Sequence, residues 1–316
     1  MATVGAMSVF HRMLLAGRDA ARLAADLATA LPDLETRTVA HGPLSADDAA
    51  WADSYTGFTV PPNLTDSGIR WFHLPMAGVD RVVEELSGSD VVLTRTVGGM
   101  PRAIGNYVVA HLLADAWQLR EYAAQQLEAR WEPLPSPRVA GRSAVVLGTG
   151  EIGSGVAEAL RGAGYRVGGA NTRGTPADAF DDVVALADAG THLESCTALV
   201  NALPLTDGTR GVLDASMLER LDGAVVVNVG RGASLVPADL RAALDAGSVR
   251  RAVLDVLETE PLPAEDWRWS DPRVTVTPHV SGPTEPEDVV EAVVTAHAAF
   301  AAGRTPPHVV DLGRGY

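Results

Sequence analysis

The stretch "VVLGTGEIGSGVAEAL", residues 145–160, places Gly148, Gly150 and Gly153 between an apolar run and a helical run. In a turn with this spacing, the first glycine permits a tight bend and the second lets a pyrophosphate approach the backbone. The third lets the helix pack closely against the strand, and the start of the helix offers N–H groups and partial positive charge to phosphates. Because a strand precedes the turn and a helix and a second strand follow it, the turn predicts a dinucleotide-binding domain.

Apolar runs alternate with helical patterns on both sides of this turn. Such alternation is typical of a parallel sheet that helices cover on both faces. One of the helices is expected to open with a capping box from Thr191 to Glu194. The predicted strands are "RMLLAG", "SYTGFTV", "IRWFHL" and "DVVLTRT" in the first hundred residues, and "SAVVLG", "YRVGGA", "TALVNAL", "AVVVNV", "RAVLDV" and "VTVTPH" after the turn. The sequence therefore predicts an α/β fold.

A helical pattern also runs from Pro101 to Arg130, and the prolines of "WEPLPSPR" end it. A long helix here is typical of a domain boundary or a dimer contact. A plain buried helix explains the pattern equally well.

The composition narrows the classes of function. A chain of 316 residues with 47% hydrophobic residues can form two domains with sizeable cores. The net charge of -15 argues against nucleic acid or an anionic membrane as the main partner. All 25 basic residues are arginine, which excludes lysine chemistry such as a Schiff base. No cluster of histidines and cysteines predicts a metal site.

The single cysteine, Cys196, excludes an intramolecular disulfide and fits a reducing compartment. It is expected to be a small buried hydrophobe. The N-terminal "MATVGAMSVFHRMLLAG" lacks the long apolar core of a signal peptide or a membrane span. We therefore expect the protein in the cytoplasm.

The end of the second strand bears on the choice of dinucleotide. An acidic residue there normally bonds the adenosine ribose of NAD, but here the chain reads Asn171, Thr172, Arg173. An arginine without a carboxylate beside it favours NADP(H), because it can pair with a 2'-phosphate. NAD(H) remains an alternative cofactor, because Arg173 can also be an ordinary solvated loop residue.

Three other strands end in residues that carry chemistry. "AVVVNV" is followed by Gly230 and Arg231, "RAVLDV" carries Asp255 and leads to Glu260, and "VTVTPH" ends at His279. Ligands of parallel sheets lie beyond these carboxyl ends. Reduction of a 2-oxo acid needs a planar cation for the carboxylate and carbonyl, which Arg231 supplies. It also needs a general acid, His279, and a carboxylate that orients the imidazole and favours its charged form, Glu260.

With these motifs the sequence resembles the D-isomer-specific 2-hydroxyacid dehydrogenases. The resemblance rests on "GTGEIG", "NALPLTDGTRGVL", "VVVNVGRGASLVPADLRAALDAG", "AVLDVLETEPLP" and "DPRVTVTPHVSG". Within the family, the segment from Gly105 to Pro135 and the C-terminal "VDLGRGY" are most similar to the glyoxylate/hydroxypyruvate reductase branch.

The resemblance implies a fold of two Rossmann-like doubly wound parallel-sheet domains with a cleft between them. It implies that residues 1–100 plus 283–316 bind substrate, that residues 101–282 bind the dinucleotide, and that the helix near residues 101–130 forms a homodimer contact. It also implies that the backbone amides of Met76, Ala77 and Gly78 meet the substrate carboxylate and that Asp255 and Val229 hold the nicotinamide carboxamide. The expected cofactor-binding set is Gly148, Gly150, Glu151, Ile152, Gly153, Asn171, Thr172, Arg173, Leu203, Pro204, Val229, Gly230, Asp255, His279 and Gly282, of which Leu203 and Pro204 flank the adenosine.

The predicted activity is NADPH-preferring reduction of a small 2-oxo acid, glyoxylate or hydroxypyruvate, to the D-2-hydroxy acid. One alternative is NAD-dependent oxidation of a D-2-hydroxy acid such as lactate or phosphoglycerate, with Asn171 pairing with the ribose. Another is a dinucleotide-sensing protein without catalysis on the same fold. The presence of Arg231, Glu260 and His279 together argues against the second alternative.

Overall fold

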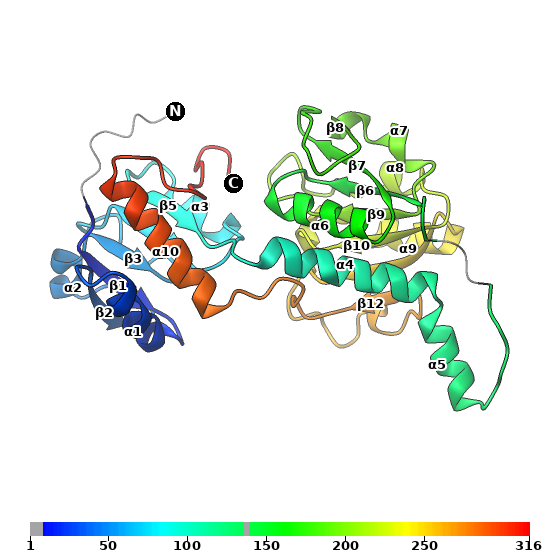
Figure 1. The fold of residues 1–316 in the computed structure, drawn as a ribbon, viewed down its shortest axis with the longest axis horizontal. Helices are drawn as coiled ribbons and strands as arrows, with labels where there is room; N and C mark the ends of the chain where they lie inside the picture. Colours follow the sequence, from blue (N-terminus) through cyan, green and yellow to red (C-terminus); the bar gives the residue numbers. More distant parts are fainter. Residues whose placement is uncertain (1–8, 136–138) are drawn as a thin grey trace. The chain divides into compact units, whose positions relative to one another are not determined.

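The computed structural model describes residues 9–135 and 139–316. The start of the N-terminal segment and the last three residues of "WEPLPSPR" therefore lie outside the described residues. The chain forms two compact units (Figure 1): the described part of Met1–Gly99 with Thr284–Tyr316, called unit 1, and Met100–Pro283, called unit 2. In the described ranges, no helix is both long and apolar enough to cross a membrane.

Unit 1 contains a five-stranded parallel sheet with the order β2-β1-β3-β4-β5. This is the order of flavodoxin-like doubly wound folds. Its centre is an aromatic cluster in which the rings of Phe10, Trp71 and Phe300 lie 4.9–5.3 Å apart. The cluster packs the C-terminal helix against Trp71 of β4 and against Phe10, which precedes β1. The elements are β1 (Arg12–Ala16), α1 (Ala20–Ala30), β2 (Glu35–Val39), α2 (Ala46–Trp51), β3 (Ser54–Thr56), β4 (Trp71–Leu74), α3 (Asp80–Leu86), β5 (Val92–Arg95) and α10 (Pro286–Ala301).

Unit 2 contains a seven-stranded parallel sheet with the order β12-β11-β10-β9-β6-β7-β8. Read from β8, the first six strands follow the Rossmann order, and β12 extends it. The elements are α4 (Met100–Ala116), α5 (Leu119–Leu127), β6 (Ser143–Leu147), α6 (Glu151–Gly162), β7 (Arg166–Asn171), β8 (Asp182–Ala185), α7 (Gly190–Leu193), β9 (Ala198–Asn201), α8 (Ala215–Leu218), β10 (Ala224–Asn228), α9 (Pro237–Ala246), β11 (Val249–Leu254) and β12 (Val274–Val276), with 3₁₀ turns η1 (Leu186–Asp188), η2 (Gly232–Ser234) and η3 (Trp267–Trp269).

Successive strands are added to one side of β6 up to β8 and to its other side from β9 onward, so the strand order reverses between β6 and β9. Right-handed crossovers on the two sides of such a point place their helices on opposite faces of the sheet, as α6 and α9 do (Figure 1). The prediction of an α/β fold with doubly wound parallel sheets is confirmed. The reversal point lies at the carboxyl ends of β6 and β9, where ligands of such sheets bind.

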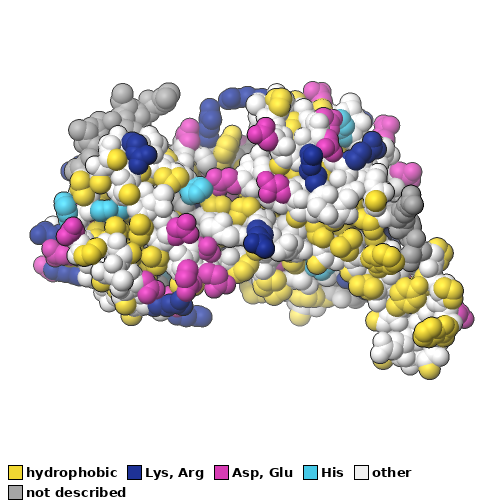
Figure 2. Space-filling view, in the orientation of Figure 1, with side chains coloured by type: hydrophobic (Ala, Val, Ile, Leu, Met, Phe, Trp, Pro, Cys, Tyr) yellow, Lys and Arg dark blue, Asp and Glu magenta, His cyan; other side chains and the backbone are white. Residues whose placement is uncertain are grey.

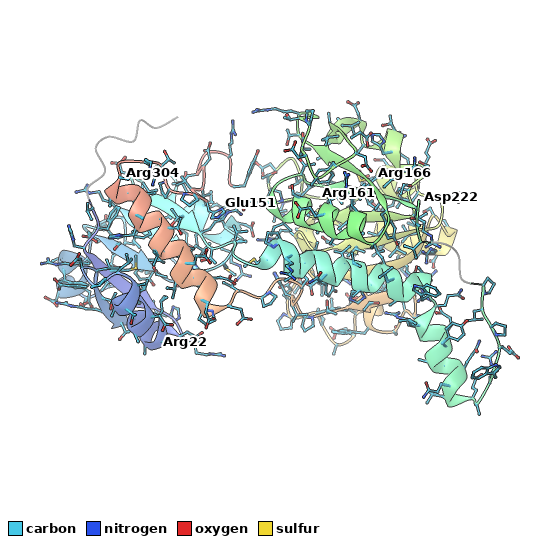
Figure 3. All side chains as sticks on the ribbon, in the orientation of Figure 1. Arg22, Glu151, Arg161, Arg166, Asp222 and Arg304 are labelled. Atoms are coloured by element: carbon cyan, nitrogen blue, oxygen red, sulfur yellow. The ribbon has the colours of Figure 1, made fainter. Side chains whose placement is uncertain are left out.

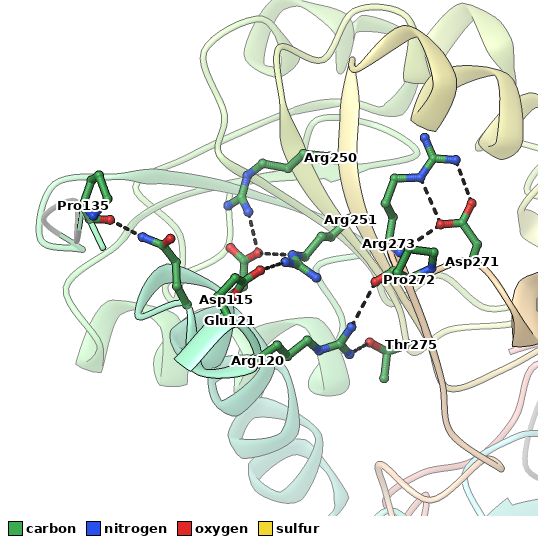
Figure 4. A network of polar contacts seen from close by, with 11 residues as sticks. Asp115, Arg120, Glu121, Pro135, Arg250, Arg251, Asp271, Pro272, Arg273 and Thr275 are labelled. Carbon is green, nitrogen blue, oxygen red and sulfur yellow. Dashed lines mark hydrogen bonds and ion pairs between the residues drawn. The ribbon is translucent and has the colours of Figure 1, made fainter. Parts of the chain in front are cut away.

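The expected single helix over residues 101–130 is wrong. Helix α4 ends at Ala116, Gln118 has a left-handed φ of 52°, and α5 then starts at Leu119. The buried apolar face stops at Ala116, whereas Leu119 is 55% exposed. At this bend Asp115 pairs with Arg250 and Arg251 at β11 (Figure 4). The end of α4 and the start of α5 are therefore both bonded to the sheet, because Glu121 also pairs with Arg251 and Arg120 bonds Thr275 on β12.

The expected capping box from Thr191 to Glu194 is also wrong. Thr191 lies inside the one-turn helix α7, whose N-cap position is Ala189. The Thr191 hydroxyl donates backwards to the carbonyl oxygen of Asp188 at 2.9 Å. A threonine that bonds the preceding turn cannot cap a new helix, so the sequence pattern was misleading here.

Helices α4 and α6 cross at small residues. A Cβ atom added to Gly105 would lie 2.7 Å from the carbonyl oxygen of Gly155, and one added to Gly155 would lie 2.5 Å from Pro101. The two backbones therefore nearly touch. This packing fixes the position of α6, whose first turn follows the glycine-rich sequence.

Cys196 belongs to the core of unit 2, as predicted. It is 2% exposed, and burial raises the pKa of its thiol to about 12. Its thiol stays protonated at neutral pH, so Cys196 behaves as a small hydrophobe.

Candidate active site

The glycine-rich turn has the geometry that a pyrophosphate needs. Gly148 has a φ of 95°, and a Cβ atom on it would lie 2.9 Å from the carbonyl oxygen of Ala202. A Cβ atom on Gly153 would lie 1.8 Å from the carbonyl oxygen of Gly148. At Gly150, by contrast, no described atom lies within 4 Å of the added Cβ. Two glycines are thus required by the protein's own packing, and the middle one leaves space for a ligand.

Helix α6 begins immediately after this turn, with Gly150 as its N-cap and Glu151 and Ile152 in its first turn. The first N–H groups of a helix have no intrahelical acceptor and attract anions. Glu151 is exposed at the start of α6, and Figure 3 marks its position. The residues present therefore fit the diphosphate of a dinucleotide.

The side-chain amide of Asn171, at the end of β7, is used within the protein. Its Nδ2 donates to Thr149 Oγ1 at 2.8 Å and to the carbonyl oxygen of Thr175 at 2.7 Å. Its Oδ1 accepts from the backbone N–H groups of Arg173 and Thr175 at 3.1 and 3.0 Å. Asn171 thus shapes a turn on which Thr172 and Arg173 are exposed. This binding pattern weighs against Asn171 as a ribose ligand.

Two buried asparagines fix the carboxyl ends of the next two strands. The motifs in the sequence did not indicate them. Asn201 ends β9 and Asn228 ends β10, and Asn201 Nδ2 donates to Asn228 Oδ1 at 2.9 Å. Asn201 Oδ1 accepts from Leu203 N and Asn228 Oδ1 accepts from Gly230 N, both at 3.2 Å. The pair therefore holds the loops that contain Leu203 and Pro204 and that contain Val229 and Gly230. An amide at the end of an otherwise apolar strand is the signal that could have found them.

His279 and Glu260 meet, as the sequence predicts. His279 Nδ1 lies 3.0 Å from Glu260 Oε2, and Glu260 Oε1 accepts from the backbone N–H of Leu257 at 2.8 Å. A carboxylate can only accept, so the imidazole donates from Nδ1. The side chain of His279 is 51% exposed. The Nε2 atom is thus the ring nitrogen available to a ligand.

The loop that carries His279 wraps around the carboxylate of Asp255, which is 1% exposed. Oδ1 accepts from Thr277 Oγ1 at 2.6 Å and from Val280 N at 2.9 Å, and Oδ2 accepts from Ser281 N at 2.9 Å. The backbone N–H of His279 donates to the Asp255 carbonyl oxygen at 2.9 Å. His279 has a left-handed φ of 54°. Asp255 therefore holds the loop in a conformation that costs a non-glycine residue energy.

The same loop ends at Gly282, which packs against α4. A Cβ atom on Gly282 would lie 2.8 Å from Ile104 Cδ1. Helix α4 thus contacts the loop that presents the histidine.

Arg231 follows β10 and is half-buried. Its Nη1 donates to the carbonyl oxygen of Gly230 at 2.7 Å, and its own carbonyl oxygen accepts from Asn228 Nδ2 at 3.1 Å. The guanidinium therefore starts from a backbone that the asparagine pair fixes.

A buried arginine, Arg268, joins the two ends of the segment that contains Glu260. Arg268 has a side chain 3% exposed and bonds both carboxylate oxygens of Glu258 and of Asp266 at 2.8 Å. Burial alone would raise the pKa of Glu258, but the hydrogen bonds from Arg268 lower it below its usual value. Hydrogen bonds from Arg268 likewise lower the pKa of Asp266. Both carboxylates are ionised at neutral pH, and the clamp fixes the segment.

Met76, Ala77 and Gly78 belong to unit 1, between β4 and α3. Met76 is 37% exposed. Arg95, at the end of the neighbouring strand β5, donates from Nη1 to the carbonyl oxygen of Ala77 at 2.8 Å. This bond fixes the peptide group between Ala77 and Gly78.

The predicted residues of unit 2 therefore follow the carboxyl ends of β6, β7, β9, β10, β11 and β12 in one sheet. They combine a diphosphate-binding turn, a histidine oriented by a carboxylate, and an arginine. This set can bind a dinucleotide and an anion and can move a proton.

The comparisons with known proteins agree with this chemistry. Residues 109–281, more than half of the chain, match the model of the "D-isomer specific 2-hydroxyacid dehydrogenase, NAD binding domain". A relative from Streptomyces coelicolor, described as an uncharacterized protein in the mprR 3' region, is 39% identical over 252 residues, which are 79% of this chain and 91% of the relative.

Two solved structures cover nearly the whole chain. A D-isomer specific 2-hydroxyacid dehydrogenase from Xanthobacter autotrophicus Py2, solved with NADPH and MES, is 27% identical with a TM-score of 0.87, covering 98% of this chain and 100% of its own. An NADPH-dependent glyoxylate/hydroxypyruvate reductase from Sinorhizobium meliloti, solved with NADP and sulfate, is 28% identical with a TM-score of 0.86, covering 97% and 100%. The chain therefore belongs to the D-isomer specific 2-hydroxyacid dehydrogenases and is an NAD(P)-dependent enzyme of that family.

Proposed function

We propose that the protein reduces a small 2-oxo acid, such as glyoxylate or hydroxypyruvate, to the D-2-hydroxy acid with NADPH. The observation that carries the proposal is the His279–Glu260 hydrogen bond at the carboxyl edge of the unit 2 sheet. A similar solved structure described as a glyoxylate/hydroxypyruvate reductase supports the choice of substrate.

In this proposal His279 is the general acid. Bound NADPH supplies the hydride. The imidazole donates its Nε2 proton to the oxygen that becomes the hydroxyl group, while Nδ1 stays bonded to Glu260. Glu260 keeps the ring from rotating, because its other oxygen is held by the Leu257 backbone.

Arg231 is proposed to bind the substrate carboxylate and to polarise the adjacent carbonyl group. A guanidinium is planar, always charged and presents paired donors that match a carboxylate. We propose that unit 1 is the substrate-binding domain and that its amides at Met76, Ala77 and Gly78 contribute to the same carboxylate. Unit 2 is then the dinucleotide-binding domain, in which Asp255 and the Val229 backbone hold the carboxamide.

We propose NADP(H) as the preferred cofactor because of the turn after β7. Arg173 is exposed there, and the amide of Asn171 is already bonded to Thr149, Arg173 and Thr175. A cation can therefore meet a 2'-phosphate, and no carboxylate stands at this position to repel it.

Replacing Arg173 by alanine is expected to raise the KM for NADPH by about 10–100-fold, because a charge-assisted hydrogen bond contributes about 1.5–3 kcal/mol. The KM for NADH should stay as it is in the wild type. Arg166→Ala is the matched control, since Arg166 is an exposed arginine at the other end of the same strand (Figure 3). Initial rates measured with each cofactor give the two KM values. An unchanged ratio of the KM for NADPH to the KM for NADH would contradict the prediction.

We also propose that a second copy of the chain covers α5 and the segment that follows it. Figure 2 shows hydrophobic side chains gathered there. Leu127 is 91% exposed and Trp131 is 98% exposed. A hollow of about 630 Å³, lined in part by Asp115, Gln118 and Arg250, lies at the base of α5. Large exposed apolar side chains of this kind mark interaction surfaces, which supports the homodimer.

The activity is tested by following the absorbance of NADPH and NADH with glyoxylate, hydroxypyruvate, pyruvate and 2-oxo acids with longer side chains. We expect fast oxidation of NADPH with one of the small acids. The reverse assay with NAD and D-lactate or D-phosphoglycerate measures the alternative of oxidation. Tight binding of NADPH without turnover of any of these acids would count against the proposal and favour a dinucleotide-sensing protein.

A further inference from the structure

A chain of hydroxyl groups runs from α4 to the loop of His279. Tyr107, on α4, has its hydroxyl oxygen 2.6 Å from Thr277 Oγ1, and Thr277 Oγ1 lies 2.6 Å from Asp255 Oδ1. Thr277 follows β12 directly and stands two residues before His279. None of the roles assigned above uses either hydroxyl group.

The direction of the two hydrogen bonds follows from the donors available. An ionised carboxylate only accepts, so the single Thr277 hydroxyl proton points to Asp255. Thr277 Oγ1 must then accept from the Tyr107 hydroxyl. The pKa of Tyr107 is raised to about 12, mainly by burial and also by the nearby charge of Asp255, although the hydrogen bond with Thr277 lowers it. Tyr107 therefore remains a donor at every pH at which the enzyme is expected to work.

The buried Asp255 carboxylate depends on its donors, because it accepts from two backbone N–H groups and from the Thr277 hydroxyl group. When a buried charge loses a hydrogen-bond donor, it finds another donor only if the charged group moves or if water enters the site. The carboxylate in turn fixes Val280 and Ser281, the two residues that follow the left-handed His279. A disturbance at Thr277 is thus passed to the imidazole.

We propose that Thr277 and Tyr107 are positioning residues for the general acid: their hydroxyl groups fix the Asp255 carboxylate around which the His279 loop is wrapped. The proposal rests on the proposed role of His279. Thr277 acts on Asp255 directly, and Tyr107 acts through Thr277. Helix α4 thereby contributes to catalysis without touching the substrate.

Thr277→Val keeps the shape of the side chain and removes the hydroxyl group. We expect kcat to fall by about 10–100-fold, the range for one lost hydrogen bond to a charged group. Thr277→Ser keeps the hydroxyl group and should restore most of kcat. Thr275→Val is the matched control two residues earlier, on β12, because the Thr275 hydroxyl bonds Arg120 and not Asp255 (Figure 4). Its kcat should equal that of the wild type.

Tyr107→Phe should lower kcat by about 3–10-fold, the range for one neutral hydrogen bond. In the Thr277→Val background it should have no further effect, because Tyr107 acts through the hydroxyl group that is then missing. Independent, additive losses would overturn the proposed chain. A Thr277→Ser variant as slow as Thr277→Val would also overturn it, since a structural role of the methyl group would then explain the loss.

A second measurement needs no substrate. Long-range ¹H–¹⁵N NMR spectra report which ring nitrogen of a histidine carries the proton, and the His279→Asn variant assigns the His279 signals. We expect a protonated, hydrogen-bonded Nδ1 in the wild type and in Thr277→Ser, and averaged ring-nitrogen shifts in Thr277→Val. Identical spectra in all three overturn the proposal. If no 2-oxo acid is reduced by the wild type, the proposed activity fails, and these spectra alone decide whether the hydroxyl chain positions His279.

Discussion

Replacing His279 by alanine is expected to lower kcat for the reduction of a small 2-oxo acid by about 10²–10⁴-fold, the usual contribution of a general acid. The reason is geometric: the Glu260 hydrogen bond fixes Nδ1, so Nε2 is the nitrogen that delivers the proton. Water must replace it as the proton donor in the variant. Initial rates measured over a range of substrate concentrations give kcat and KM separately.

The dissociation constant of NADPH should change little in the same variant, because the diphosphate-binding turn is not altered. A fluorescence titration of the purified variant measures it. His41→Ala is the control, as His41 is an exposed histidine of unit 1. Full turnover in the His279→Ala variant would show that another group donates the proton. A loss of turnover that equals a loss of NADPH binding would assign His279 to the cofactor site alone.

Much of the fold follows from local patterns in the sequence. The predicted strands are buried and rich in Val, Leu and Ala, and such runs between turn residues define parallel strands. Strands β2 and β8 were missed because β2 is largely polar and β8 begins with an exposed aspartate and is otherwise half-buried, so neither forms a buried apolar run. The bend after Ala116 was missed because the ion pairs of Asp115 with β11 that accompany it join segments distant in sequence. A helical period in the sequence carries no information about such pairings.

In the candidate site, too, local patterns in the sequence predicted some residues, whereas residues with long-range contacts were missed. His279, Glu260 and Arg231 were predicted as site residues because each follows a strand whose carboxyl end lies at the edge where ligands of such sheets bind. Asn201, Asn228, Thr277 and Tyr107 were not found, because their roles consist of hydrogen bonds between segments distant in sequence. The sequence thus indicates the groups that we propose as ligand contacts more easily than the groups that hold them in place.

The glycine-rich turn allows folding and cofactor binding to be separated by two substitutions of the same size. Gly153→Ala places a methyl group 1.8 Å from the carbonyl oxygen of Gly148. Backbone atoms cannot move aside as a flexible side chain can, so the start of α6 must shift away from β6. Overpacking costs about 1–3 kcal/mol and occasionally more, which corresponds to a fall in Tm of about 2–12 °C for a unit of this size.

Gly162→Ala is the matched control for folding, because Gly162 ends the same helix and no described atom lies within 4 Å of its added Cβ. Its Tm should equal that of the wild type or exceed it slightly, since alanine favours the helix by up to about 1 kcal/mol. Differential scanning calorimetry of both variants measures this difference. Equal Tm values for Gly153→Ala and Gly162→Ala would contradict the close packing of helix and strand.

Gly150→Ala should have the opposite effect. Its methyl group meets no described atom of the protein within 4 Å, so the Tm of the cofactor-free variant should stay near the wild-type value. The same methyl group occupies the space that we assign to the diphosphate, and one extra methyl group in a close-fitting site weakens binding by about 10–200-fold. A titration with NADPH therefore locates the ligand: weakened binding with an unchanged Tm places the diphosphate over Gly150. Unchanged binding would mean that the open space beside Gly150 has another cause.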